Sequence, residues 1–139
     1  EQKVLKDGTP LLGICVGAQM LGSASEEGKE PGLGWIEMTV RRFPDKPGLR
    51  VPHMGLTEVG RPIPDHPLVQ GLEDDARFYF VHSYYLCPEG QTQTLLSAEY
   101  GVEMAAGGVS GNIAGVQFHP EKSHRFGKVL LSNFAQGAI

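Results

Sequence analysis

A short apolar run that ends in a cysteine between two glycines constrains the fold more than any other feature. Residues 10–14 read Pro-Leu-Leu-Gly-Ile and continue directly into Cys15, Val16 and Gly17. A short, continuous apolar run of this kind is typical of a strand that is buried on both faces of a parallel sheet. From Val16 to residue 24 the apolar spacing becomes helical, so we predict a strand, a sharp turn and a helix in immediate succession.

The rest of the chain reads as an α/β sheet protein with antiparallel additions. We interpret residues 1–6 as the end of a helix, residues 25–32 as a charged loop, and residues 123–135 as a closing amphipathic helix. The glycine pair at 107–108 and the Ser-Gly-Asn stretch at 110–112 favour hairpin turns. Further strands are expected at residues 35–43, 56–59, 77–85, 94–99, 102–106 and 113–118.

The composition argues against several functional classes. Twelve Lys and Arg residues stand against 16 Asp and Glu residues, for a net charge of −4, and no basic stripe points to nucleic acid. No apolar run approaches the ~20 residues of a membrane-spanning helix. The two cysteines form no C-x-x-C pair and the five histidines are scattered, so we expect neither a disulfide scaffold nor a metal site. A cytoplasmic protein without a cofactor is the expectation.

Cys15 has the surroundings of a nucleophile on a strained strand-to-helix turn. The glycines two residues away on either side allow the strand and helix backbones to approach closely. Free N–H groups at the start of the helix would favour the thiolate, and the N–H of Val16 would be an oxyanion donor. The alternative is a buried cysteine that fills space between two packing glycines, which is how we interpret Cys87 in its own aromatic strand.

His119 is the candidate base for this thiol. It ends an apolar strand and is followed by Pro120 and Glu121. In an extended chain residues i and i+2 face the same way, so His119 and Glu121 project together, and the proline stiffens the link. A carboxylate beside an imidazole fixes its tautomer and stabilises the imidazolium. We expect one cleft beyond the strand ends. Without Cys15, a strand-end histidine on a solvated turn would be the better reading.

These stretches together resemble the class I, triad-type glutamine amidotransferases. The elbow GICVGAQ and the FHPE stretch carry the class-level resemblance. Residues 25–28, 32–36, 51–55, 77–84 and 117–124 resemble more specifically the glutaminase subunit of imidazole glycerol phosphate synthase, of histidine biosynthesis. The resemblance runs from about residue 10 to residue 134 and implies an open, flavodoxin-like α/β sheet with helices on both faces plus antiparallel additions.

The resemblance also implies a role for each site residue. Cys15 would attack the carboxamide of L-glutamine to form a thioester, His119 would transfer protons, and Glu121 would orient His119. Ammonia would pass to a docked (β/α)8-barrel synthase subunit, with Lys122 and Met54 at the interface. The implied substrate contacts are Gln19, Glu27, His82, Ser83 and Tyr84. Judged from composition alone, Glu27 is as well explained as a solvated loop charge.

Two departures from the family pattern leave alternatives open. Leu56 and Thr57 follow His53-Met54-Gly55, where the family usually has Trp-Asn, and such a change could mark a paralogue that supplies ammonia for surface-sugar amidation. Family members also begin with further strands and a glycine-rich oxyanion loop before the helix that starts here at Glu1. We therefore expect residues 1–139 to be a single, N-terminally truncated domain that is unstable and inactive by itself, and a catalytically inert domain is a further alternative.

Overall fold

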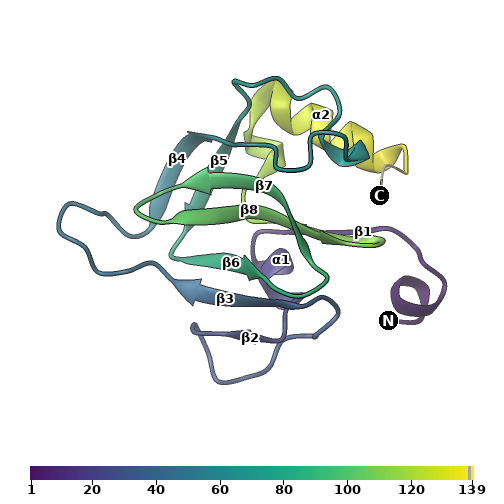
Figure 1. Cartoon of the computed structure of the whole chain (residues 1–139), viewed down its shortest axis with the longest axis horizontal. Helices are drawn as coiled ribbons and strands as arrows, with labels where there is room; N and C mark the ends of the chain where they lie inside the picture. The colour runs from purple at the N-terminus through teal and green to yellow at the C-terminus, as the bar shows by residue number, and fades with distance from the viewer. Residues whose placement is uncertain (138) are drawn as a thin grey trace.

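A computed structural model describes residues 1–137 and 139, and its main feature is a seven-stranded mixed sheet (Figure 1). The helical turns are η1 (Gln2–Lys6), η2 (Pro67–Val69) and η3 (Pro120–Lys122), and the α-helices are α1 (Val16–Met20) and α2 (His124–Ala135). The strands are β1 (Leu11–Ile14), β2 (Ala24–Ser25), β3 (Met38–Arg42), β4 (His53–Glu58), β5 (Arg77–His82), β6 (Tyr84–Pro88), β7 (Gln93–Glu99), β8 (Glu103–Ser110) and β9 (Ile113–Val116).

The strand order in the main sheet is β1-β9-β8-β6-β3-β2, with β7 paired along β8. The β1–β9 and β2–β3 pairs are parallel and the other pairs are antiparallel. Strands β4 and β5 form a separate two-stranded antiparallel sheet. The parallel β1–β9 pair matters most for the site, because it brings the carboxyl ends of two strands to the same edge.

The alternating side chains of β1 and β9 divide the apolar core into two clusters. Leu12 and Ala114 belong to the cluster that α2 covers with Leu130, whereas Leu11 and Ile113 belong to the cluster around α1. Since successive side chains of a strand point to opposite faces, these strands are covered on both sides. The expected α/β sheet with helices on both faces and antiparallel additions is therefore confirmed.

The glycines around the elbow are needed for close packing between α1 and the sheet. A Cβ at Gly13 would lie 2.8 Å from the carbonyl oxygen of Gly17, and one at Gly115 would lie 3.0 Å from the Cβ of Ala18. Any side chain at either position would push α1 away from β1 and β9. The predicted succession of strand, sharp turn and helix at residues 11–20 is confirmed.

The helix after the elbow is shorter than expected and ends at Met20. Backbone hydrogen bonds draw the next residues to β3, since Ser23 N–H donates to the Met38 carbonyl at 2.9 Å. A Cβ at Gly22 would collide with that same carbonyl. Ala24 consequently begins β2 instead of ending a helix, and the strand expected at residues 35–43 begins only at Met38.

Two other expectations about strands were wrong. The run at residues 77–85 is split at Ser83 into β5, which pairs with β4, and β6, which pairs with β3. The glycine pair at 107–108 lies inside β8, and the hairpin turn occurs only at residues 111–112. A Cβ at Gly107 would lie 3.2 Å from the Gly115 carbonyl, so this glycine allows the neighbouring strand β9 to lie close to β8.

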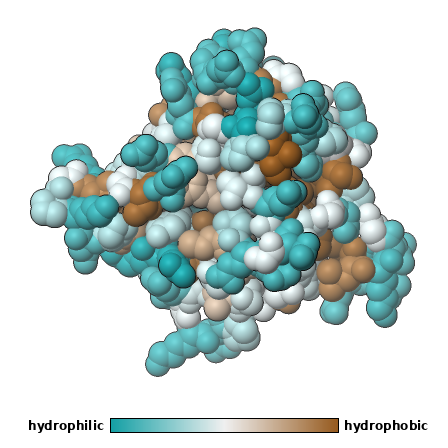
Figure 2. Space-filling model, in the orientation of Figure 1, coloured by the Kyte–Doolittle hydropathy of each residue, from teal (hydrophilic) through white to brown (hydrophobic). Residues whose placement is uncertain are grey.

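The surface mixes hydrophilic side chains with separate apolar patches on the face seen in Figure 2. In the part of the chain that the structure describes, no helix has the length and hydropathy to cross a membrane. The large apolar side chains that are exposed are Leu5, Val16, Met20, Leu33, Met54 and Leu56.

Candidate active site

Cys15 occupies a strained turn at the end of β1. Its φ of 55° and ψ of −111° lie outside the regions that non-glycine residues ordinarily adopt. The turn is anchored because the Cys15 N–H donates to the Val116 carbonyl at 2.8 Å, and the Cys15 carbonyl accepts from Gln19 N–H at 3.1 Å. Strain of this kind costs on the order of 1–3 kcal/mol and is common at catalytic positions. This backbone geometry is that of a nucleophile elbow.

The pKa of the Cys15 thiol is raised above its ordinary value, mainly because burial penalises the charged thiolate. The Val16 N–H and the Gln117 side chain donate toward the sulfur and lower the pKa, while the charges of Glu121 and Glu27 raise it. The N–H at the helix start thus favours the thiolate as expected, but burial outweighs it and the net pKa is raised. A base is needed to take the proton.

His119 and Glu121 form a close pair at the start of η3. The Nδ1 atom of His119 lies 2.8 Å from Oε1 of Glu121. A carboxylate can only accept, so Nδ1 carries a proton, and in the neutral imidazole the lone pair that a general base requires is on Nε2. The backbone of His119 is also held, because its N–H donates to the Tyr79 carbonyl at 2.9 Å and its carbonyl accepts from Ser123 Oγ at 2.6 Å.

The parallel pairing of β1 with β9 brings these groups to one edge of the sheet. Ile14 lies opposite Val116, so Cys15 and Gln117 follow at the same strand ends. The Gln117 amide nitrogen is 3.8 Å from the Cys15 sulfur, and His119 comes two residues later. The charge of Glu121 acts on the thiol, which agrees with this placement. The structure therefore places Cys15 and the His119–Glu121 pair beyond the ends of neighbouring strands, although His119 and Glu121 do not line the cleft beside Cys15.

A cleft of about 320 Å³ opens beside the cysteine. Its volume is at the small end of the range for ligand sites. The Glu27 carboxylate on its wall has no hydrogen-bond or ion-pair partner among residues 1–137 and 139, so it is available to a ligand cation. All five predicted substrate contacts contribute to the lining, which consists of Cys15, Val16, Gln19, Glu27, Pro52, Val81, His82, Ser83 and Tyr84.

The imidazole of His82 is already engaged within the protein. Its Nδ1 donates to the Tyr84 carbonyl at 2.7 Å, so its Nε2 accepts from Nδ1 of the buried His53 at 2.9 Å. Burial lowers the pKa of each imidazole to about 4, and both are neutral at pH 7. Because both ring nitrogens of His82 are engaged, only the His82 backbone is available to contact a substrate. No role for His53 was predicted from the sequence, although the 51–55 motif contains it.

Gln117, like His53, lies at the site although no role for it was predicted from the sequence. Its side chain is fully buried, and its Oε1 accepts from Nε2 of Gln19 at 3.0 Å. The Gln19 Nε2 also lies 3.5 Å from the Tyr84 carbonyl, so the Gln19 donors face the protein. The only available signal was a polar residue in an otherwise apolar strand immediately before the FHPE stretch.

The two predicted interface residues lie outside the cleft. The Met54 side chain is 62% exposed on β4, and Lys122 Nζ lies 5.8 Å from the centre of the Tyr79 ring. Tyr79 is opposite the half-exposed Leu56 in the β4–β5 pairing. Met54, Leu56, Tyr79 and Lys122 thus form an outward-facing apolar and basic area, which we call the hairpin face.

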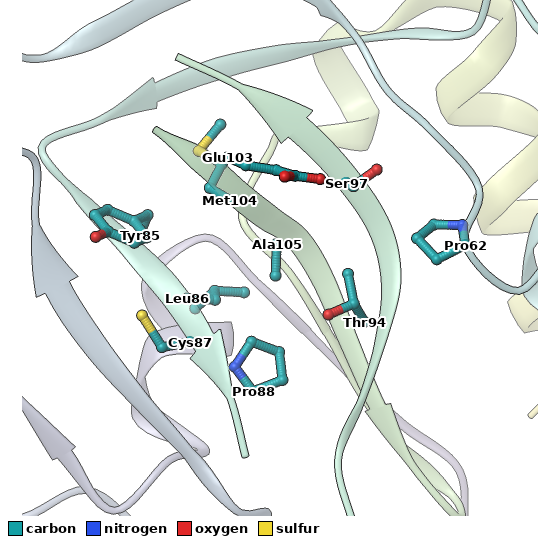
Figure 3. Close-up of a pocket in the computed structure, with 10 residues that line it drawn as sticks. All are labelled: Pro62, Tyr85, Leu86, Cys87, Pro88, Thr94, Ser97, Glu103, Met104 and Ala105. Carbon is teal, nitrogen blue, oxygen red and sulfur yellow. The ribbon is translucent and has the colours of Figure 1, made fainter. Parts of the chain in front are cut away.

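A larger cavity of about 470 Å³ lies elsewhere, between β6, β7 and β8 (Figure 3). It shares no lining residue with the Cys15 cleft, and none of its lining residues is a histidine. It contains Cys87, whose pKa is raised by burial. A thiol without a neighbouring base is a poor nucleophile, so the smaller cleft is the better candidate site. In the described part of the chain, no cluster of His, Cys, Asp and Glu is arranged to hold a metal ion.

Known proteins resemble this chain over nearly its whole length. The family model for glutamine amidotransferase class-I matches residues 1–137. Imidazole glycerol phosphate synthase subunit HisH 2 of Pseudomonas aeruginosa is 48% identical over 136 residues, which cover 98% of this chain and 66% of that protein. Imidazole glycerol phosphate synthase subunit HisH of Bdellovibrio bacteriovorus is 50% identical over 139 residues, which cover 98% of this chain and 68% of that protein. The chain thus spans about two thirds of the length of these curated relatives.

Solved structures share the fold at lower identity. A glutamine amidotransferase from Thermotoga maritima superimposes with a TM-score of 0.65 at 22% identity, over 98% of this chain and 51% of that one. Another glutamine amidotransferase structure gives a TM-score of 0.66 at 19% identity, over 96% and 66% of the two chains. The family model spans nearly the whole chain, and two relatives are 48% and 50% identical to it. The chain therefore belongs to the class-I glutamine amidotransferase family.

Proposed function

We propose that this chain carries the glutaminase site of an imidazole glycerol phosphate synthase. It would hydrolyse L-glutamine to glutamate and ammonia, and ammonia would pass to a (β/α)8-barrel synthase subunit in histidine biosynthesis. The observation that carries the proposal is the elbow cysteine at one strand end with the His119–Glu121 pair at the neighbouring one. The relatives at 48% and 50% identity are named as subunits of that synthase. Two free cysteines fit a reducing cytoplasm.

The first half of the reaction would form a glutamyl thioester. Nε2 of His119 takes the proton of the Cys15 thiol as the sulfur attacks the carboxamide carbon of glutamine. The same imidazole then gives its proton to the departing nitrogen, which leaves as ammonia. The Glu121 carboxylate, 2.8 Å from Nδ1, stabilises the imidazolium between these two transfers. The raised pKa of Cys15 makes this proton transfer necessary, because the resting sulfur is a thiol.

The second half would release glutamate. His119 activates a water that attacks the thioester carbonyl, and the Cys15 sulfur leaves and regains its proton. In both halves the carbonyl oxygen becomes negative next to the sulfur. The Val16 N–H, which donates toward the sulfur, would donate to that oxygen.

The cleft offers complementary charge to glutamine. The unpartnered carboxylate of Glu27 is suited to the α-amino group. The backbone between β5 and β6, at residues 82–84, offers N–H groups to the α-carboxylate. Gln19 directs both of its donor contacts toward the protein, so its Oε1 is the atom left to accept from the substrate amide.

The hairpin face is the surface that we propose for the barrel subunit. Met54 and Leu56 expose apolar side chains of the kind that interface cores bury, and Lys122 adds a charge at the rim. Lys122 is three residues from His119, so a partner docked there would lie close to the reacting groups and could receive ammonia before it reaches water.

A labelling and turnover experiment tests the proposed activity. Co-expressed with a barrel synthase subunit, the protein should release glutamate from glutamine and lose this activity in Cys15→Ser. A glutamine-analogue electrophile should label Cys15, and the control Cys87→Ser should keep both labelling and turnover. Labelling that persists in Cys15→Ser, or glutamate release that does not depend on Cys15, would contradict the site assignment. Turnover that a barrel subunit leaves unchanged would contradict the partner.

A further inference from the structure

Gln117 is a polar residue in a place where an apolar one would ordinarily stand. It follows β9, whose four residues are all buried, and it is followed by the fully buried Phe118. Its own side chain is 0% exposed. Burying an amide costs free energy unless its donors and acceptor find partners, so this side chain needs a reason beyond filling space.

The hydrogen bonds of Gln117 allow only one orientation of its amide. The Gln19 Nε2, 3.0 Å away, can only donate, so it must face the oxygen of Gln117. The NH2 group of Gln117 is then turned toward the Cys15 sulfur at 3.8 Å. Gln19 is oriented in turn by the Tyr84 carbonyl, which can only accept and lies 3.5 Å from the same Nε2. Two amides thus connect a backbone carbonyl to the nucleophile.

We propose that Gln117 is a positioning residue that holds an N–H donor on the Cys15 sulfur, and that Gln19 fixes the orientation in which it donates. This inference rests on the proposed function, in which Cys15 is the nucleophile. A sulfur that has lost its proton accepts a hydrogen bond more strongly than a thiol does, so a fixed donor favours the reactive form.

The surroundings of Cys15 explain why such a donor is useful. Burial and the carboxylates of Glu121 and Glu27 all disfavour a negative sulfur. Glu121 is needed beside His119, and Glu27 is the proposed contact for the substrate's amino group, so neither charge can be removed without loss of its own role. A neutral donor from Gln117 offsets these effects and adds no charge to the cleft.

A purely structural role would make a different prediction. If Gln117 only joined β9 to α1 through Gln19, its replacement would lower the melting temperature and leave the titration of Cys15 unchanged. Gln117→Met is the informative change, because methionine has a similar volume and shape but lacks the donor. Gln117→Glu keeps the shape and places a carboxylate against the sulfur.

The pH dependence of Cys15 alkylation by iodoacetamide separates the two roles. The rate is measured on the full chain in a Cys87→Ser background, with thermal melting run on each variant. Gln117→Met should raise the midpoint of the alkylation profile by ~0.5–1 pH unit, which is a three- to tenfold smaller thiolate fraction below the midpoint. Gln117→Glu should raise it further. The control Gln93→Met, at an exposed position of β7, should leave it unchanged.

Two outcomes overturn the proposal. In the first, Gln117→Met folds but its alkylation midpoint equals that of the control Gln93→Met. In the second, the midpoint of Gln117→Glu is no higher than that of Gln117→Met. If Gln117→Met does not fold, Gln19→Met is tested instead, because Gln19 is only half-buried on a short helix. Loss of the Gln19 amide should leave the Gln117 amide free to rotate and should therefore raise the alkylation midpoint. An unchanged midpoint there also overturns the proposal. Alkylation requires no glutamine, so a shifted midpoint without glutaminase activity would reject only the proposed function.

Discussion

Acidification from pH 7 to pH 5 should destabilise this protein through its buried histidine pair. His53 and His82 are 2% and 5% exposed, and their ring nitrogens are joined at 2.9 Å. His53 is stacked between the rings of Phe80 and Tyr100, with centroids 4.9 and 4.0 Å away. Neither imidazole can gain a proton without placing a charge inside this aromatic cluster, and a charge on His82 also repels one on His53.

The magnitude follows from the difference between the folded and unfolded pKa values. Burial lowers the pKa of each ring from 6.5 to about 4. Because the folded pKa lies below the unfolded one, the unfolded state binds more protons, and stability is present above pH 6.5 and is lost as the pH falls toward 4. For one such group the loss between pH 7 and pH 5 is about 2 kcal/mol. For the pair we expect about 2–4 kcal/mol.

Urea denaturation at pH 7, 6 and 5 measures this loss, followed by circular dichroism. The test variant is the double change His53→Gln with His82→Asn, which keeps an acceptor for Thr57 and a donor for the Tyr84 carbonyl. Its free energy of unfolding should depend much less on pH over this range. The control His124→Asn removes an exposed histidine with a φ of 52°, which asparagine tolerates, and should keep the wild-type dependence. An equal pH dependence in the double variant would refute the reasoning.

Three further changes have definite expected results. Glu121→Gln removes the charge that stabilises the His119 imidazolium, and should lower kcat for glutamate release ~100-fold or more without lowering the melting temperature. Gly127→Ala should lower the free energy of unfolding in urea by ~2–3 kcal/mol, because the added Cβ would collide with the Pro120 carbonyl, although alanine normally favours a helix. The control Gly28→Ala adds a Cβ in open space and should leave the free energy of unfolding unchanged. Leu56→Asp should weaken co-purification of a barrel subunit and leave the stability of the protein unchanged, since the Leu56 side chain is half-exposed. Retained co-purification would exclude the hairpin face as the surface that binds the barrel subunit.

Local patterns predicted the parts of the site that depend on neighbouring residues. The apolar run before Cys15 and Gly13 were sufficient to predict the elbow, because its φ of 55° and the close packing at Gly13 are properties of a few consecutive residues. The same packing role expected for Gly17 was wrong, since a Cβ there would meet no atom within 4 Å. His119 and Glu121 lie side by side as predicted, but the predicted reason was wrong: the chain is not extended there, because Pro120–Lys122 form the helical turn η3.

Strand limits were predicted less well, because they depend on neighbours that are distant in sequence. The glycines at 107–108 resemble a turn locally, but they lie inside β8 because they pair with β9 on one side and with β7 on the other. The aromatic run at 77–85 is uniform in sequence, yet it changes from one sheet to the other at Ser83, since β4 and β3 offer separate pairing edges.

The sequence alone determined which residues are candidates for the reactive groups, whereas only the tertiary structure decided the surroundings that set their protonation. Cys15 has a raised pKa because the fold buries it and gathers Glu27 and Glu121 around it, and the short α1 cannot offset that burial. Gln117 contacts the Cys15 sulfur although the two residues are 102 positions apart in the sequence. The physical reason is that local backbone geometry is encoded within a few residues, while desolvation and hydrogen-bond partners depend on every segment that the fold brings together.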